Sequence, residues 1–156
     1  MLQLTKRTEY GLIALVHMVD RGSDPVSARE IGERYPIPRR LLAEVLKDLC
    51  RAELVESQRG AAGGYTLARS ADEITVGDIV EVLEGRPAIS NCETSSLHRN
   101  AECEMQPTCR IRSPLQRIRE AIWTMLERTT LRSLRESAPL LPFEAHPALA
   151  FRTPQS

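Results

Sequence analysis

Three cysteines, Cys92, Cys103 and Cys109, are the residues of this chain whose type and spacing best suit inorganic chemistry. Ten residues separate the first pair and five separate the second. Thiolates are preferred protein ligands of iron–sulfur clusters and of zinc. Structural zinc sites usually place roughly two to four residues between paired cysteines, and no such pair occurs here. The spacing alone therefore leaves an iron–sulfur cluster, a zinc ion and uncoordinated thiols open.

The length and composition are those of a small globular protein. The 156 residues suffice for one domain, or for one small domain with an oligomerisation helix. Basic and acidic residues balance at 21 each, so net charge gives no support for nucleic-acid binding and any basic surface must be local. The chain contains no phosphate-binding loop, no Ser/His/Asp set and no paired carboxylates placed for catalysis, so an enzyme is not expected.

The N-terminus lacks the basic and apolar regions of a signal peptide. The apolar run over residues 12–19 contains His17 and is too short to span a bilayer. We therefore expect a cytoplasmic protein with no membrane partner. In that reducing compartment, four cysteines indicate metal or redox chemistry rather than structural disulfides.

The elements that would position the cysteines are mainly helical. Ser27 with Glu30 has capping-box spacing, and Thr75 with Asp78 predicts a second helix start. Hydrophobic periodicity and the breaks between periodic segments predict helices over residues 8–21, 27–34, 38–52 and 75–83. Two short strands are expected over residues 53–57 and 65–68, with a glycine-rich hairpin tip between them.

The C-terminal half is expected to contain a loop, a long helix and a tail. Ser113 followed by Pro114 predicts the N-cap and first residue of a helix that reaches Arg135. Its apolar positions form a short heptad seam of the kind that joins two helices: Ile111, Leu115, Ile118, Ile122, Met125 and Thr129. The expected units are residues 1–84, a cysteine-bearing loop over 85–112, a dimerisation helix over 113–136 and a flexible tail over 137–156.

The helix, tight turn, amphipathic helix and glycine-tipped hairpin over residues 27–68 follow the order of a winged helix-turn-helix. The expected fold class is therefore mainly α with a small β-hairpin wing, extended by a long C-terminal dimerisation helix. In such a domain the second helix enters the DNA major groove and the wing reaches the minor groove. The candidate DNA-binding residues are Arg39, Arg40, Ala43, Glu44 and Lys47 on the helix and Arg59 on the wing. For the helix taken alone, a solvated charged face is the alternative.

The sequence resembles the family of winged-helix iron–sulfur transcription regulators that includes IscR, NsrR and RirA. The resemblance covers residues 1–136. It is carried by residues 4–6 with Tyr10, by residues 31–37, by Leu54-Val55 and above all by the wing, which reads Arg-Gly-x-x-Gly-Gly-Tyr from Arg59 to Tyr65. The resemblance implies a 2Fe-2S or 4Fe-4S cluster held by the three loop cysteines. It also implies that Ala43 stands where some members carry a glutamate that helps to choose between classes of DNA site.

This chain departs from the family pattern around the cluster. The first cysteine gap is longer than usual, and Arg112 stands where some members have a ligating histidine. Glu9 occupies the position where NsrR-like members carry a ligating aspartate that is supplied across the dimer. His98, a small thiol or water are the other candidates for the fourth ligand. Cys50 falls on the apolar stripe of the 38–52 helix and is expected in the core.

The expected function is that of a homodimeric transcription regulator that binds an inverted-repeat operator in double-stranded DNA. Its signal would be cluster status, redox state, iron or nitric oxide, with Cys92, Cys103, Cys109 and Glu9 as ligands. A regulator of the same family that senses through thiols without a cluster is one alternative. A zinc- or cluster-bearing interaction module that does not bind DNA is another.

Overall fold

The computed structural model of the chain describes residues 3–60, 63–86 and 108–136. Its elements are α1 (Lys6–Arg21), α2 (Ala28–Arg34), α3 (Arg39–Arg51), β1 (Val55–Gln58), β2 (Gly64–Leu67), α4 (Val76–Glu84), α6 (Arg112–Arg128) and α7 (Leu131–Arg135). The expected fold class is confirmed: the protein is mainly helical, with one antiparallel β-hairpin in a winged helix-turn-helix arrangement. Cys92, Cys103, His98 and the tail over 137–156 lie outside the described residues.

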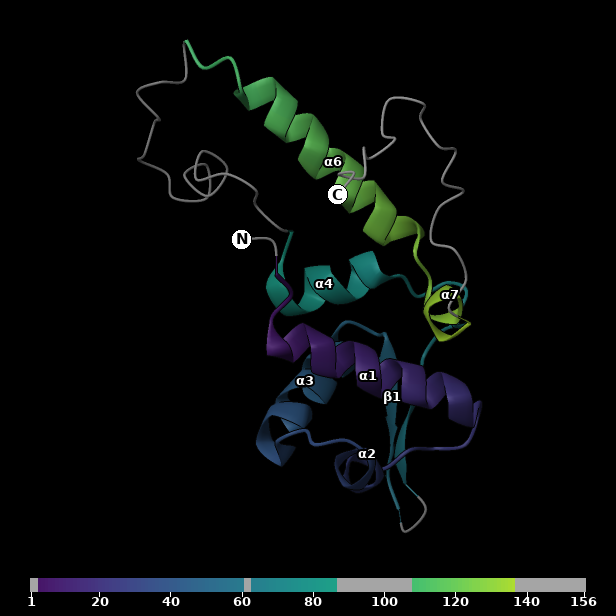
Figure 1. The fold of residues 1–156 in the computed structure, drawn as a ribbon. Coiled ribbons are helices and arrows are strands. Elements are labelled where there is room, and N and C mark those ends of the chain that lie inside the picture. The colour runs from purple at the N-terminus through teal and green to yellow at the C-terminus, as the bar shows by residue number, and fades with distance from the viewer. Residues whose placement is uncertain (1–2, 61–62, 87–107, 137–156) are drawn as a thin grey trace, which may run out of the picture.

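The helices form successive layers (Figure 1). Helix α6 lies on one side of α4, and α1 lies on the other side, with α2, α3 and the hairpin beyond α1. Helix α4 contacts α1, α3 and α6, so it joins the C-terminal helix to the rest of the fold. In the described part of the chain, no helix is long and apolar enough to cross a membrane.

Helix α1 begins at Lys6, two residues before the predicted start at Thr8. The cause is an unrecognised cap, because the Thr5 hydroxyl accepts a hydrogen bond from the Thr8 backbone N–H. The Glu84 carboxylate at the end of α4 completes this helix start, since Oε1 accepts bonds of 2.8 Å from both the Thr5 backbone N–H and its hydroxyl. The beginning of α1 is therefore tied to the end of α4.

The core lies between α1, α3 and α4. The apolar stripe predicted on α3 is confirmed, since Leu42, Val45, Leu46 and Leu49 are buried. Helix α3 begins at Arg39 with Pro38 as its N-cap, so Pro38 is not the first helical residue as predicted. At the other end, Glu53 takes a left-handed conformation with φ 56°, and the Leu54 N–H bonds back to the Leu49 carbonyl at 3.0 Å. This Schellman ending directs the chain into the hairpin.

The hairpin pairs Val55 with Leu67 at one end and Gln58 with Gly64 at the other. The backbone conformation and close backbone contacts explain why glycines occupy this hairpin. Gly60 has φ 121°, and a Cβ on Gly63 would lie 2.3 Å from the Gln58 carbonyl oxygen. A Cβ on Gly64 would lie 2.7 Å from the Val26 carbonyl oxygen, because Tyr65 and Val26 exchange two backbone hydrogen bonds there. The wing is thus fixed to the segment that precedes α2.

Helix α4 begins as predicted from Thr75 and Asp78, which form a reciprocal capping box. Ser27 likewise caps α2 through the Glu30 N–H, but the Glu30 carboxylate lies 3.2 Å from His17 Nε2 instead. The predicted start of α6 is wrong. That helix begins at Arg112 after Ile111, and no side chain caps it, so Ser113 lies within the first turn.

The prediction of one helix reaching Arg135 is also wrong, because α6 ends at Arg128. Thr129 is extended, and Thr130 caps a separate helix, α7, by accepting a bond from the Ser133 N–H. Backbone bonds to the segment before α4 hold this break: Val76 N–H to Thr129 O at 2.8 Å, and Leu131 N–H to Ile74 O at 2.9 Å. The turn lets Leu131 enter the main core, where it is fully buried.

Candidate DNA interface and thiol site

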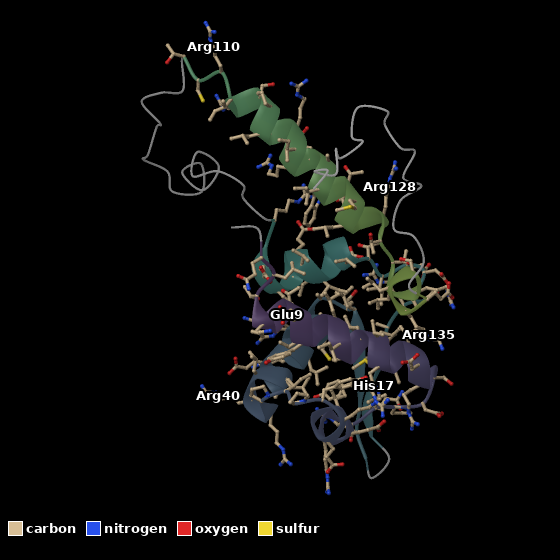
Figure 2. All side chains as sticks on the ribbon, viewed as in Figure 1. Glu9, His17, Arg40, Arg110, Arg128 and Arg135 are labelled. Carbon is tan, nitrogen blue, oxygen red and sulfur yellow. The ribbon has the colours of Figure 1, made fainter. Side chains whose placement is uncertain are left out.

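The five predicted DNA-binding residues of α3, the helix that is expected to enter the major groove and is called the reading helix below, form one exposed surface opposite its buried stripe. Arg39, Arg40, Ala43, Glu44 and Lys47 are all exposed. Figure 2 shows Arg40 extending away from the body of the molecule. An exposed helix face of this length has the dimensions that the major groove admits. The structure brings these residues together as the sequence predicted.

Two of these residues form an ion pair. Arg40 Nε donates to Glu44 Oε1 at 3.2 Å across one helical turn, and the Arg40 side chain is 94% exposed. An exposed pair of this spacing adds only about 0.3–0.5 kcal/mol to helix stability. It does, however, favour one orientation of the guanidinium.

The reading helix is held to α1 by an acidic residue that sequence reasoning missed. The carboxylate of Asp48 pairs with Arg7 of α1 through one oxygen and with Arg51 through the other, at 3.3 Å. Asp48 therefore serves an intramolecular contact. No local sequence pattern predicts the pair between Arg7 and Asp48, because the two residues lie 41 positions apart.

Arg59 is exposed at the end of β1, immediately before Gly60. The Gly63 N–H donates to the Gly60 carbonyl at 3.0 Å and so closes the wing beside it. The placement agrees with the predicted minor-groove contact of the wing, which requires an exposed cation at the hairpin tip.

Cys109 is the only one of the three loop cysteines that the structure describes. It is half-buried and free, two residues before the N-cap of α6. Within the described ranges, no group of three or more His, Cys, Asp or Glu side chains is placed to hold a metal ion. The arrangement of the three thiols consequently stays a prediction.

Glu9 lies in the first turn of α1, where its carboxylate forms an ion pair with Lys6 Nζ at 2.5 Å. Its side chain is 37% exposed and so accessible to an outside partner. Figure 2 shows Glu9 well away from Arg110, the neighbour of Cys109. One protomer therefore does not bring Glu9 and Cys109 together.

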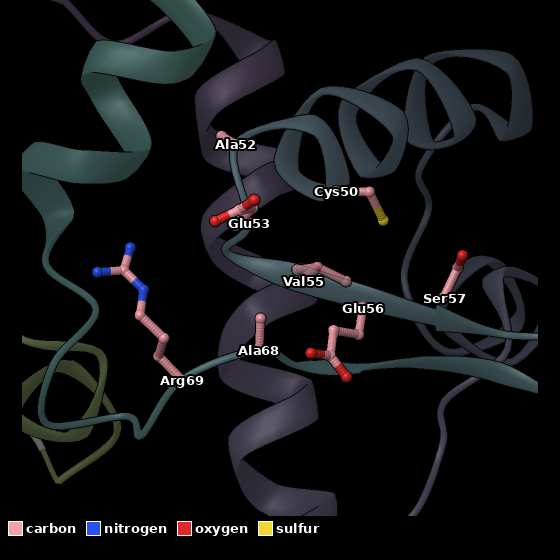
Figure 3. A pocket seen from close by; sticks show the side chains of 8 residues that line it. All are labelled: Cys50, Ala52, Glu53, Val55, Glu56, Ser57, Ala68 and Arg69. Atoms are coloured by element: carbon pink, nitrogen blue, oxygen red, sulfur yellow. The ribbon is translucent and has the colours of Figure 1, made fainter.

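Cys50 is half-buried at the end of α3 and packs against the main core, in agreement with the prediction. It lines an open pocket with Glu53, Ser57 and Arg69 (Figure 3). Burial raises the pKa of the Cys50 thiol. The protonated form is thereby favoured, which suits a structural role better than metal ligation.

The two edges of the undescribed cysteine segment are Arg86 and Thr108, and Arg86 contacts α6. Its guanidinium lies 4.8 Å from the centre of the Trp123 ring. The Trp123 indole N–H donates to Glu127 Oε1 at 2.5 Å, and Arg86 itself pairs with Glu81 at 3.2 Å. This cluster was not predicted from the sequence, although the single tryptophan on an amphipathic helix was a usable signal.

His17 of α1 is buried on the side of that helix that faces α2. Its Nε2 faces Glu30 at 3.2 Å and its Nδ1 faces the Tyr35 hydroxyl at 3.5 Å. Both ring nitrogens thus have partners inside the fold. This histidine stabilises the helix-turn-helix packing and is not available as a ligand.

The comparisons with known proteins agree with this geometry. Residues 4–137 match the model of the Rrf2 family, described as an iron-dependent transcriptional regulator. A curated relative, protein rrf2 of Nitratidesulfovibrio vulgaris, is 33% identical over 145 residues, which cover 92% of this chain and 94% of the relative.

Two solved structures are similar along most of their length. CymR, the global cysteine regulator of B. subtilis, is 30% identical with a TM-score of 0.70, over 89% of this chain and 100% of that one. IscR of T. potens is 30% identical with a TM-score of 0.64, over 88% of this chain and 89% of that one. A family match over nearly the whole described chain, with the winged fold and its exposed reading helix, shows that this protein belongs to the Rrf2 family of transcription regulators.

Proposed function

We propose that this regulator senses the state of an iron–sulfur cluster, held by Cys92, Cys103 and Cys109, and converts it into a change in DNA affinity. Glu9 of a second protomer supplies the fourth ligand in this proposal. The cluster is 2Fe-2S or 4Fe-4S, and when bound it supplies iron that reacts to oxidants, nitric oxide and iron supply. A cytoplasmic location belongs to the same proposal.

The observation that carries the proposal is the position of Cys109. Its thiol is free and half-buried, shortly before the helix whose partly exposed apolar seam is expected to join two protomers. The donor set also fits, because thiolates are the principal protein ligands of cluster iron and carboxylates bind iron in non-haem sites. Glu9 fits as well, since its carboxylate is accessible and held by one exposed lysine.

Members of the Rrf2 family bind DNA, commonly as dimers. For this chain we propose docking of α3 in the major groove through Arg39, Arg40, Ala43, Glu44 and Lys47, with Arg59 in the minor groove. A two-fold symmetric dimer carries two reading helices, so its operator would be an inverted repeat. Residues 1–84 would be the DNA-binding unit, 85–112 the cluster loop, 113–136 the dimerisation segment and 137–156 a tail.

The packing supports a connection between the sensor and the reader. Gly77 of α4 lies against the Glu127 backbone of α6, where an added Cβ would be 3.1 Å from the Glu127 Cα. At its other end α4 is bonded to α1 through Glu84 and Thr5. Helix α1 is in turn paired with α3 through Arg7 and Asp48. A change in the position of α6 would therefore be carried to the reading helix by packed elements.

A second candidate function is thiol sensing without a cluster. The likeness to the global cysteine regulator of B. subtilis supports it, because that structure has a TM-score of 0.70, against 0.64 for T. potens IscR, at the same 30% identity. The free thiol of Cys109 suits either chemistry. The interaction module without DNA binding is no longer favoured, because the family is one of transcription regulators.

The test is anaerobic purification followed by iron, sulfide and zinc analysis and a visible spectrum. The parent protein is expected to be coloured, with iron and sulfide in similar amounts, and Cys109→Ala is expected to be iron-poor because a three-thiolate site loses a ligand. Cys50→Ala is the matched control and keeps its colour. If the parent and all three loop variants contain no iron and sulfide, the thiol-sensing function replaces the cluster.

A further inference from the structure

The geometry of α3 points to Glu44 as a positioning residue that sets base specificity through Arg40. This inference rests on the proposed docking of α3 in the major groove. It assigns two different roles to neighbouring side chains on that surface. Arg40 reads a base, and Glu44 determines which donors of Arg40 face the DNA.

The first step concerns which N–H donors of the Arg40 guanidinium are occupied by Glu44. Arginine has five N–H donors, one on Nε and four on the two terminal nitrogens. Glu44 Oε1 accepts the Nε donor of Arg40 at 3.2 Å. Among the described residues, neither terminal nitrogen of Arg40 has a hydrogen-bond partner, and together they form the fork that bonds guanine O6 and N7. The ion pair thus occupies the donor that base recognition does not need.

Exposure carries the second step. The Arg40 side chain is 94% exposed and Glu44 is about half exposed, so no other packing fixes the arginine. A free arginine on a surface samples many rotamers, and ordering it on binding costs entropy. The bond to Glu44 restricts those rotamers before DNA arrives. Once water leaves the interface, the same bond strengthens because the surroundings are less polar.

Charge carries the third step. A carboxylate facing the groove is repelled by phosphates and so lowers affinity for every sequence alike. Glu44 therefore weakens non-specific binding while it orients Arg40 for one base pair. Both effects raise the ratio of specific to non-specific affinity, which is the quantity that matters for a regulator.

The chain offers a matched control in α2. Arg29 Nε donates to Glu33 Oε1 at 2.7 Å with the same four-residue spacing, and both side chains are exposed. This pair lies outside the reading helix. Glu33→Gln removes the same charge from the same type of pair, so it reports the effect of charge without the effect on base reading.

The experiment uses full-length protein and a duplex selected from a randomised library by that protein, together with all single-base-pair variants of the selected duplex. Glu44→Ala is expected to reduce discrimination at one base pair per half-site about tenfold, at the same position that Arg40→Ala affects. The double variant should show no further loss there. Glu44→Gln keeps an acceptor for Arg40 Nε, so it should retain most of the discrimination while binding all duplexes more tightly.

Three other results overturn the inference. They are an unchanged base preference in Glu44→Ala, losses at different positions in the Glu44 and Arg40 variants, and an effect of Glu33→Gln equal to that of Glu44→Ala. Failure of the parent protein to select any sequence would instead contradict the proposed docking. Circular dichroism of each variant confirms that these exposed substitutions leave the helices intact.

Discussion

The Glu84 carboxylate stabilises the fold more than a surface position on α4 would suggest. Burial raises the pKa of this carboxyl, but the nearby Thr8 hydroxyl and the hydrogen bonds donated by the Thr5 hydroxyl and backbone N–H outweigh it and hold the pKa below its usual value. This contact could not be predicted from local sequence patterns, because Glu84 and Thr5 are 79 residues apart. The same holds for Asp48 with Arg7, whereas the exposed arginines of α3 followed directly from helical periodicity.

Replacement of Glu84 tests this contact. Glu84→Gln is expected to lower the free energy of unfolding at pH 7 by about 1 kcal/mol, the usual cost of losing a helix cap. Because the folded pKa is lowered, the contribution is complete above the unfolded pKa and disappears as pH falls through the folded value. Denaturant titrations between pH 7 and pH 3 should show the two proteins converging in acid. Glu56→Gln, an exposed change on β1, is the control; a difference that persists unchanged at pH 3 contradicts the account.

Among the helices, two of the capping patterns in the sequence predicted the helix start correctly and one did not. Thr75 with Asp78 and Ser27 both cap helices as predicted. Ser113 with Pro114 failed because a helix can begin earlier and accept proline anywhere in its first turn, where no N–H is needed. The break after Arg128 was invisible because it depends on backbone bonds to Ile74 and Val76, which are distant in sequence.

Replacing two helical glycines by alanine is expected to change the free energy of unfolding in opposite directions. Gly77→Ala places a Cβ 3.0–3.1 Å from Glu127 atoms, including its backbone, and is expected to lower the free energy of unfolding by roughly 1–3 kcal/mol. Gly32→Ala in α2 meets nothing within 4 Å and should raise it by up to about 1 kcal/mol. Urea unfolding of the two variants measures both. Equal shifts in the same direction would show that α6 does not pack closely on α4.

For the whole molecule, the sequence predicted a dimer seam that the structure leaves only partly exposed, because Thr129, its last predicted member, is buried and follows the end of α6. Ile111 is 63% and Ile118 is 50% exposed, although Trp123 on the same helix is buried against α4. One helix thus presents one apolar face to its own protomer and another to solvent. The proposed sensor site could not be predicted from one chain, because Figure 2 shows Glu9 well away from Arg110, the neighbour of Cys109.

Introducing a charge into the seam tests the dimer. Ile118→Glu is expected to give a monomer in analytical ultracentrifugation, because burying an unpaired carboxylate at an apolar interface is unfavourable. Gln116→Glu adds the same charge to an exposed position outside the seam and should leave the dimer intact. A dimer that tolerates Ile118→Glu at micromolar concentration would place the interface elsewhere.

Control of DNA affinity by the state of the cluster can be measured in one anaerobic binding titration. The selected duplex is titrated with cluster-loaded protein and with the same preparation after cluster removal, for the parent and for Glu9→Ala. The account predicts a difference of about tenfold or more between the two states of the parent, which corresponds to about 1.4 kcal/mol of coupling. It also predicts a much smaller difference for Glu9→Ala. Equal affinities for the loaded and cluster-free parent would contradict the account.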